Sequence, residues 1–409
     1  MKTYDVVLAL LKNAIWGDSK EPLCLDDDIA WSDVYQELRA QAVEGIVVDA
    51  LPAVKNLDLQ LKMEWLHRVT KNISYWNQLM TLQDEVIASL KNAEIPHVVL
   101  KGLGAAYYYQ APELRKMGDI DLQVKPEDFD RALQILLNAG FAILEEDDGR
   151  HVELAKGQFA VELHHHFASN SDQKAAALFD RSLELAIDRS LKMKIQGHEF
   201  SMLPKLENGL VLLAHMDQHM ETGLGLRQII DWMLFVDREL DDHWWESEFE
   251  QWTRRLGMHT LALTVTKMCQ MFLGLRTEGI SWCTIADAQL CSDLMELTME
   301  RGNFGIKLGD SKRAVPILGL MADITRIPVL LQESGCRNWK AIEKYPFLKS
   351  FAWLYQICRY IKQCFTRKHP IRRLLSEIQE SRHQASVLEK LSLAKDTKKK
   401  LDGKKNHNR

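Results

Sequence analysis

Cysteine is scarce and unpaired in this sequence of 409 residues. The seven cysteines are odd in number and show neither a CxxC pair nor the spacing of a zinc ribbon. Disulfide scaffolds and structural zinc sites need such pairs. The pattern therefore predicts reduced thiols and a cytoplasmic protein. The cysteines are Cys24, Cys269, Cys283, Cys291, Cys336, Cys358 and Cys364.

The sequence also lacks a long apolar run and an excess of positive charge. No stretch of 18 apolar residues occurs, so no membrane span is expected. The apolar run at 6–11 follows Asp5 and is too short for a signal peptide. The formal net charge of -5 argues against general nucleic-acid binding, which needs an extended basic surface. A local contact, such as one with a tRNA end, remains compatible with this charge.

Hydrophobic periodicity divides the chain into four parts. Residues 1–94 have a helical pattern, and residues 95–203 alternate between strand and helix patterns. Residues 204–385 return to a helical pattern, and the Lys-rich segment 386–409 is expected to be a disordered tail. The predicted fold class is α+β: a small mixed β-sheet core, flanked by N-terminal helices and a larger C-terminal helical domain.

Seven short segments of the core have the patterns of β-strands. A helix that begins at Pro126 and ends at Gly140 separates the second from the third. The segments are 95–100, 117–124, 142–144, 151–155, 158–165, 191–195 and 199–203.

Two aspartates on the second predicted strand are separated by a single residue. Since side chains two apart on a strand share a face, Asp119 and Asp121 place two carboxylates side by side. Carboxylates this close repel each other unless a cation lies between them. Magnesium binds carboxylate and phosphate oxygens together, and two such ions can hold the attacking and leaving oxygens of nucleotidyl transfer. A solvated surface strand is the alternative interpretation of this motif taken alone.

Glu162 supplies a third carboxylate, on the predicted strand 158–165. We expect Asp119, Asp121 and Glu162 to be the catalytic, metal-binding set. Glu162 would either bind a second ion or accept the proton of an attacking hydroxyl. His164 shares its face and is expected to contact a phosphate or to orient Glu162.

A glycine-containing segment follows the first predicted strand. Lys101 and Gly102 are expected to form a phosphate-binding turn, because glycine allows the backbone to approach a triphosphate and lysine adds charge. Arg115 could hold a phosphate in bidentate fashion. A surface salt bridge with Glu113 or a neighbouring residue is the alternative for Arg115.

Other groups of polar residues permit further interpretations. His164, His165 and His166 suggest zinc, but adjacent strand residues point in opposite directions and cannot all bind one ion. His215 and His219 have metal-compatible helical spacing, although a packed helix face is the simpler interpretation.

Arg227 and Asp231 are four residues apart, which favours an intrahelical ion pair. A basic residue of the helical domain could instead close over a nucleotide. The aromatic segment 347–365 has a basic end and could lie on a membrane surface, while a core helix is the alternative.

Several of these motifs, in this order, resemble a known family. They are LKG (100–102), Arg115, GDIDLQV (118–124), the helix that ends at Gly140-Phe141, and VELHHHF (161–167). Together they look like the bacterial nucleotidyltransferase family often labelled uncharacterised, within the DNA-polymerase-β-like nucleotidyltransferase superfamily. The resemblance spans roughly residues 30–240, because HMDQH (215–219), Arg227 and Asp231 look like the helical part of that family.

The resemblance implies a five-stranded mixed sheet, magnesium and an NTP donor. It implies that Asp119, Asp121 and Glu162 bind the metal and that Lys101 and Gly102 lie on the phosphate side. The sequence departs from the superfamily where Gly102 is followed by Leu103 rather than serine or glycine. Glu162 is also one methylene longer than the aspartate common at that position.

These features predict a magnesium-dependent nucleotidyltransferase, with Mn²⁺ as a substitute ion, that moves an NMP from an NTP such as ATP to a hydroxyl-bearing acceptor. The acceptor would be a small molecule, a protein side chain or an RNA end. A degenerate protein that binds a nucleotide or a partner without turnover is one alternative. A metal-dependent phosphohydrolase is another, since the same metals could activate water.

Overall fold

A computed structural model gives the structure of two separate units of the chain. The first unit ends at Lys307 and the second covers residues 308–394. In the first unit the structure describes residues 3–17, 29–54, 56–145, 149–168, 172–220 and 222–307. In the second it describes residues 308, 331–332, 335–336, 339, 342, 345–366, 386–387 and 389–391.

The N-terminal part is helical, as predicted. It consists of α1 (Thr3–Trp16), α2 (Trp31–Ala40), the 3-10 helix η1 (Val48–Ala53) and α3 (Leu59–Asn92). Helix α3 begins where the Asp58 carboxylate accepts a hydrogen bond of 3.0 Å from the Leu61 amide. The predicted apolar stripe on this helix is buried against the sheet.

All seven predicted strands form, and they belong to a single mixed sheet of order β3-β4-β5-β2-β1-β7-β6. The family resemblance implies five strands. The hairpin β6–β7 extends that sheet, because β7 pairs in parallel with β1. The strands are β1 (His97–Val99), β2 (Asp119–Val124), β3 (Ala142–Glu145), β4 (His151–Lys156), β5 (Phe159–His164), β6 (Leu191–Ile195) and β7 (His198–Met202).

One face of this sheet is apolar and covered by helices. The side chains of Ile120, Leu122 and Val124 on β2 lie in a buried cluster with residues of α3 and α5 (Phe129–Asn138). The predicted start of α5 at Pro126 is a 3-10 turn, η3 (Pro126–Asp128), and Gly140 follows its end with a φ of 89°. The alternate residues of β2, including both aspartates, therefore face the opposite side.

Three of the helices lie between strands of the sheet along the chain. Short helices α4 (Lys101–Ala106) and η2 (Pro112–Leu114) connect β1 to β2, and α6 (Gln173–Ile187) follows β5. Helix α4 contacts β2, α7 (Lys205–His219) and α8 (Leu226–Glu239), so it lies between the sheet and the helical part.

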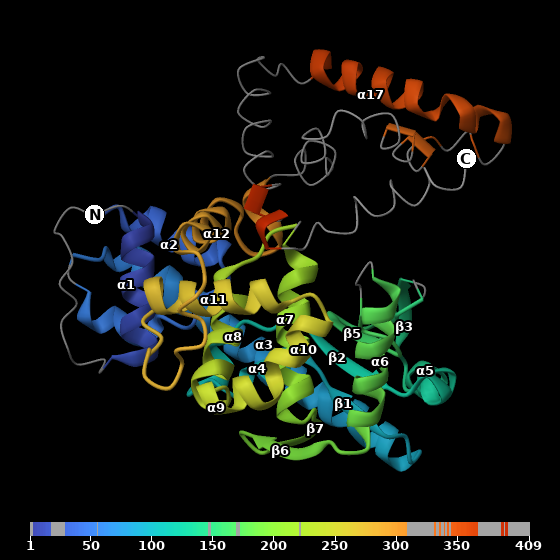
Figure 1. Ribbon diagram of the computed structural model, residues 1–409, viewed down its shortest axis with the longest axis horizontal. Coiled ribbons are helices and arrows are strands. Elements are labelled where there is room, and N and C mark those ends of the chain that lie inside the picture. The colour runs from blue at the N-terminus through green and yellow to red at the C-terminus, as the bar shows by residue number, and fades with distance from the viewer. Residues whose placement is uncertain are drawn as a thin grey trace. The chain divides into compact units, whose positions relative to one another are not determined.

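The remaining helices of the first unit pack around α7 and α8 (Figure 1). The Trp16 indole of α1 donates a 2.7 Å hydrogen bond to the Leu273 carbonyl, so the N-terminal helix lies beside the C-terminal end of α11 (Figure 1). The helices are α9 (Asp242–Trp244), the π-helical turn η4 (Trp245–Phe249), α10 (Glu250–Arg255), α11 (His259–Phe272), α12 (Ala288–Arg301) and η5 (Asn303–Leu308).

The second unit contains η7 (Pro346–Phe351) and α17 (Ala352–Thr366). The segment predicted as a core or membrane-surface helix is thus helical from Ala352. Its described aromatic residues Phe347 and Trp353 are 69% and 43% exposed. Most of the predicted tail, from residue 392, lies outside the described residues. Among the described helices, none has the length and apolarity that crossing a bilayer requires.

Candidate active site

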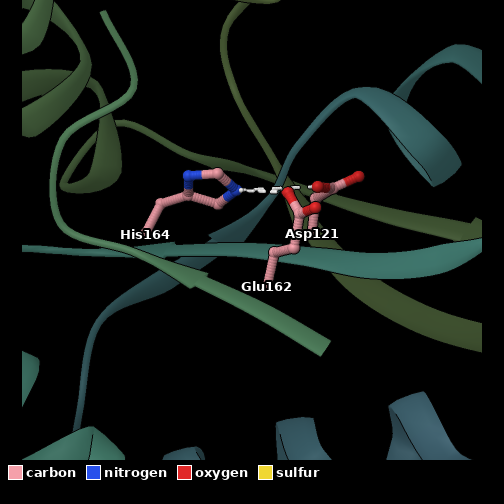
Figure 2. Close-up of side chains that lie close together, drawn as sticks. All are labelled: Asp121, Glu162 and His164. Atoms are coloured by element: carbon pink, nitrogen blue, oxygen red, sulfur yellow. Dashed lines mark hydrogen bonds and ion pairs between the residues drawn. The ribbon is translucent and has the colours of Figure 1, made fainter. Parts of the chain in front are cut away.

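Two carboxylates meet where β2 and β5 run in parallel. The register pairs Asp119 with Ala160, Asp121 with Glu162 and Gln123 with His164. Because paired residues of neighbouring strands point to the same face, the Asp121 and Glu162 side chains lie next to each other (Figure 2). The sequence predicts each carboxylate on its own strand, and strand pairing brings them together.

The Lys101 ammonium lies between these two carboxylates. Its Nζ is 2.9 Å from Asp121 Oδ1 and 3.2 Å from Glu162 Oε2. The contact with Glu162 is a hydrogen bond, whereas Asp121 Oδ1 is buried and has no aligned hydrogen-bond donor. Burial opposes the charge on Lys101, but the Asp121 and Glu162 carboxylates outweigh it and raise the lysine pKa.

His164 completes this cluster. Its Nε2 lies 3.1 Å from Glu162 Oε2 and 3.6 Å from Asp121 Oδ1, and the imidazole points at both carboxylates (Figure 2). The ring also stacks on His151 of β4, at a centroid distance of 4.9 Å. Burial would raise the pKa of Glu162, but the His164 hydrogen bond and the Lys101 charge lower it well below its usual value. The imidazole of His164 thus contacts Glu162, and the expectation that it orients this carboxylate stays a prediction.

Asp119 lies at the start of β2 and is partly exposed. Burial and the nearby Asp121 charge raise its pKa to about 7, with Lys101 acting in the opposite direction. The two aspartates therefore repel each other as the strand geometry predicts. Among the described residues, the groups whose ligand atoms converge within 4.8 Å are Asp121, Glu162 and His164. Asp119 flanks this cluster.

The segment expected to be a phosphate-binding turn is the first turn of a helix. Residues Lys101 and Gly102 open α4, directly after β1. A side chain at Gly102 would place its Cβ 2.9 Å from Met117 Cε and 3.7 Å from Asp121 Oδ2. Glycine therefore keeps the space beside the Asp121 carboxylate open. The sequence indicated the lysine and the glycine, but not that the lysine contacts the carboxylates.

Arg115 is buried rather than exposed. Its Nε and one terminal nitrogen bind the two carboxylate oxygens of Asp231, at 2.7 and 2.6 Å. The Tyr109 hydroxyl donates a further hydrogen bond of 2.8 Å to Asp231. The expected salt bridge of Arg115 with Glu113 is therefore wrong, and so is the expected pair of Arg227 with Asp231. Both expected pairs join residues that are close in the sequence. The pair that forms instead joins Arg115 to Asp231, which is more than a hundred residues away.

In the described part of the chain, the other histidines considered from the sequence do not belong to a group of three converging metal-binding side chains. Strand β5 ends at His164, and the amides of His165 and His166 both donate to the Arg150 carbonyl; the rings of these two histidines lie 4.7 Å apart, but the three imidazoles do not converge on one point. His215 and His219 lie with their ring centroids 4.7 Å apart. Burial lowers the pKa of His215 well below its usual value and that of His219 to about 4, and the Lys101 charge adds to both shifts.

The sequence of this chain matches a protein family described as uncharacterised nucleotidyltransferase, over residues 27–274. The match covers more than half of the chain, including the whole sheet and helices α7 and α8. The chain belongs to this family. A comparison with curated proteins found no match.

Two of the solved structures that match part of the chain are the following. One is the solution structure of the antibiotic-resistance factor ANT(2'')-Ia, with 14% identity, a TM-score of 0.30, and coverage of 39% of this chain and 83% of that one. The other is the crystal structure of an antigenic nucleotidyltransferase-like protein from Paracoccidioides brasiliensis. It has 12% identity, a TM-score of 0.31, and coverage of 50% of this chain and 97% of that one.

Proposed function

We propose that this protein is a magnesium-dependent nucleotidyltransferase that moves an NMP from an NTP to a hydroxyl-bearing acceptor. The observation that carries the proposal is the pairing of Asp121 with Glu162 across β2 and β5, beside Asp119, in a chain of a nucleotidyltransferase family. Three carboxylates on one face of a sheet, together with phosphate oxygens of a nucleotide, are an oxygen-rich ligand set for divalent cations.

The residues present fit a divalent cation. Asp121 Oδ1 is buried without an aligned donor, and Glu162 Oε2 and His164 Nε2 lie close to it. Carboxylates suit Mg²⁺ and Mn²⁺, and we assign Asp121 and Glu162 as ligands with Asp119 as the third acidic group. A bound divalent cation would neutralise the charge that develops on the phosphate oxygens. Mn²⁺ is the expected substitute.

The proposed transfer breaks one bond and makes one bond. The acceptor hydroxyl oxygen attacks the α-phosphorus of the NTP, the bond from that phosphorus to the bridging oxygen of the β-phosphate breaks, and pyrophosphate leaves with the bonding electrons. The hydroxyl proton passes to a base. Glu162 already accepts hydrogen bonds from Lys101 and His164, which favours a ligand role for Glu162 over proton transfer.

The experiment is incubation of the full chain with Mg²⁺ and each of the four NTPs, labelled at the γ- or α-phosphate. Acceptor arms contain the protein alone, total tRNA, or a panel of small polyhydroxylated compounds. Release of pyrophosphate with the α-label on an acceptor supports the proposal. Release of orthophosphate alone supports a phosphohydrolase instead.

Matched variants make the result specific to the site. Asp121→Asn and Glu162→Gln remove one charge each with little change of shape, and Asp130→Asn does the same on the exposed side of α5. We expect the first two to abolish pyrophosphate release and Asp130→Asn to leave it unchanged. NTP binding by calorimetry without turnover in any arm would favour the binding-protein alternative. Absence of NTP binding would overturn the enzyme proposal.

A further inference from the structure

Helix α8 holds a buried arginine that has no carboxylate partner among the described residues. The Arg227 side chain is 8% exposed, and one of its terminal nitrogens donates a 2.9 Å hydrogen bond to the Lys116 carbonyl. Its Nε is buried without a hydrogen-bond partner. The guanidinium has five donors in a planar fork, so most of its hydrogen-bonding capacity is unused by the described part of the protein.

The nearest acidic residue along the helix, Asp231, does not neutralise this charge. Both of its oxygens are bound by Arg115, and one of them also accepts the Tyr109 hydroxyl. Asp231 is therefore already neutralised by Arg115, and the positive charge of Arg227 is left over. Burial and the Arg115 charge lower the pKa of Arg227, which reports the same excess of positive charge. Burying a cation without a counterion destabilises the folded protein. Proteins retain such unfavourable arrangements at functional sites, where a ligand supplies the missing negative charge.

The location of Arg227 connects it to the candidate active site. Lys116, whose carbonyl it binds, lies three residues before Asp119 in the chain, and the Asp119 carboxylate acts on the Arg227 charge. Helix α8 packs on α4, which carries Lys101 and contacts β2. The guanidinium thus comes from the helical part of this region, and the acidic groups come from the sheet.

A neighbouring aromatic residue contacts the guanidinium. The Arg227 Cζ lies 5.3 Å from the ring centroid of Phe304, and His219 lies edge-on to the same ring at 4.6 Å. Phe304 has a φ of 54°, a conformation that costs energy in a residue other than glycine, and its amide donates a 2.9 Å hydrogen bond to the Gly223 carbonyl. His215 and His219 are neutral because of burial, so these histidines add no positive charge to that of Arg227.

We infer that Arg227 binds a phosphate group of the polyphosphate tail of the donor nucleotide. This inference rests on the proposed function and assigns to Arg227 a part of its substrate. Arg115, the arginine first expected to hold a phosphate, is fully engaged by Asp231. Lys101 is engaged by the two carboxylates. In the described part of this region, Arg227 is the buried cation whose N–H groups are still available to bind an anion.

The test is calorimetric binding of inorganic pyrophosphate, an NTP with Mg²⁺, and the matching nucleoside to the full chain. The variants are Arg227→Met and Arg227→Lys, with Arg238→Met on the exposed part of the same helix as control. Loss of charged hydrogen bonds predicts Kd values for pyrophosphate and NTP that are about tenfold to a hundredfold weaker in Arg227→Met. We expect an unchanged Kd for the nucleoside, a smaller loss in Arg227→Lys, and no loss in Arg238→Met.

A second readout separates ligand binding from a structural role. If Arg227 is held for a ligand, the melting temperature of ligand-free Arg227→Met equals or exceeds that of the unsubstituted protein, and the stabilisation by pyrophosphate is lost. A lowered melting temperature with an unchanged pyrophosphate Kd in the folded variant would overturn the inference. If the unsubstituted protein binds the NTP and Arg227→Met binds it equally well, the inference fails while the proposed function stands. If neither binds it, both fail.

Discussion

Replacement of Lys101 by methionine tests how the acidic cluster is neutralised. The Lys101 ammonium lies 2.9 Å from Asp121 Oδ1 and 3.2 Å from Glu162 Oε2. A divalent cation bound to these oxygens would compete with the ammonium for them. Lys101→Met removes the competitor and keeps a side chain of similar length. We therefore expect the variant to bind Mn²⁺, without nucleotide, more tightly than the unsubstituted protein.

The magnitude follows from the two contacts. Coulomb's law at an effective dielectric constant of about 20 gives about 6 kcal/mol for the shorter contact and about 5 kcal/mol for the longer one. Much of this attraction offsets the cost of burying the charges. A net contribution in the range of charged hydrogen bonds, about 1.5–3 kcal/mol, corresponds to a gain in Mn²⁺ affinity of about tenfold to a hundredfold.

The assay is Mn²⁺ titration followed by electron paramagnetic resonance, at pH 8, where the carboxylates stay ionised. Lys125→Met, which removes a surface lysine paired with Asp188, is the matched control and should leave the Mn²⁺ affinity unchanged. In the absence of metal, Lys101→Met should melt at a lower temperature, because it leaves the buried Asp121 and the half-buried Glu162 without their cation. Mn²⁺ affinity in Lys101→Met equal to or weaker than that of the unsubstituted protein would refute the reasoning.

Two further predictions concern the stability of the helical part. Asp231→Asn leaves the buried Arg115 without its counterion, so denaturant unfolding should show a loss of about 3–5 kcal/mol; a loss below about 1 kcal/mol would contradict the burial of this pair. The pKa of His219 is lowered to about 4 by burial, so the unfolded state binds more protons between about pH 6.5 and pH 4, and the free energy of unfolding should fall as the pH falls through this range. His219→Asn should flatten that dependence by at most about 3 kcal/mol at pH 4, and an unchanged pH profile would show that His219 does not cause it.

The strands and the acidic motif could be predicted from the sequence because they are local patterns. Alternation on 117–124 separates Ile120 and Leu122 from Asp119 and Asp121, and the structure buries the former in the core. The partner of each strand is not a local property. The pairing of Asp121 with Glu162 depends on β2 and β5 running in parallel, which the sequence of neither strand specifies.

The errors in the sequence-based prediction have the same origin. Spacing along a helix favours a pair of Arg227 with Asp231, and spacing along the chain favours Glu113 for Arg115. Tertiary packing instead brings Arg115 to Asp231 across 116 residues, and it leaves Arg227 without a carboxylate partner among the residues that the structure describes. The contact of Lys101 with Asp121 was not predicted either, because it depends on the pairing of β1 with β2; the phosphate-side role of Lys101 stays a prediction. Long-range contacts decide which charges neutralise one another.

The most direct test of the central claim is a crystal structure of the full chain with Mn²⁺ and a non-hydrolysable NTP, in which the ion is located by its anomalous scattering. The account predicts an anomalous peak within about 2.0–2.3 Å of carboxylate oxygens of Asp121 and Glu162, with phosphate oxygens of the nucleotide on the same ion. It also predicts that the Lys101 ammonium has left the position between the two carboxylates. A nucleotide bound elsewhere, or Mn²⁺ bound away from these carboxylates, would contradict the proposed active site.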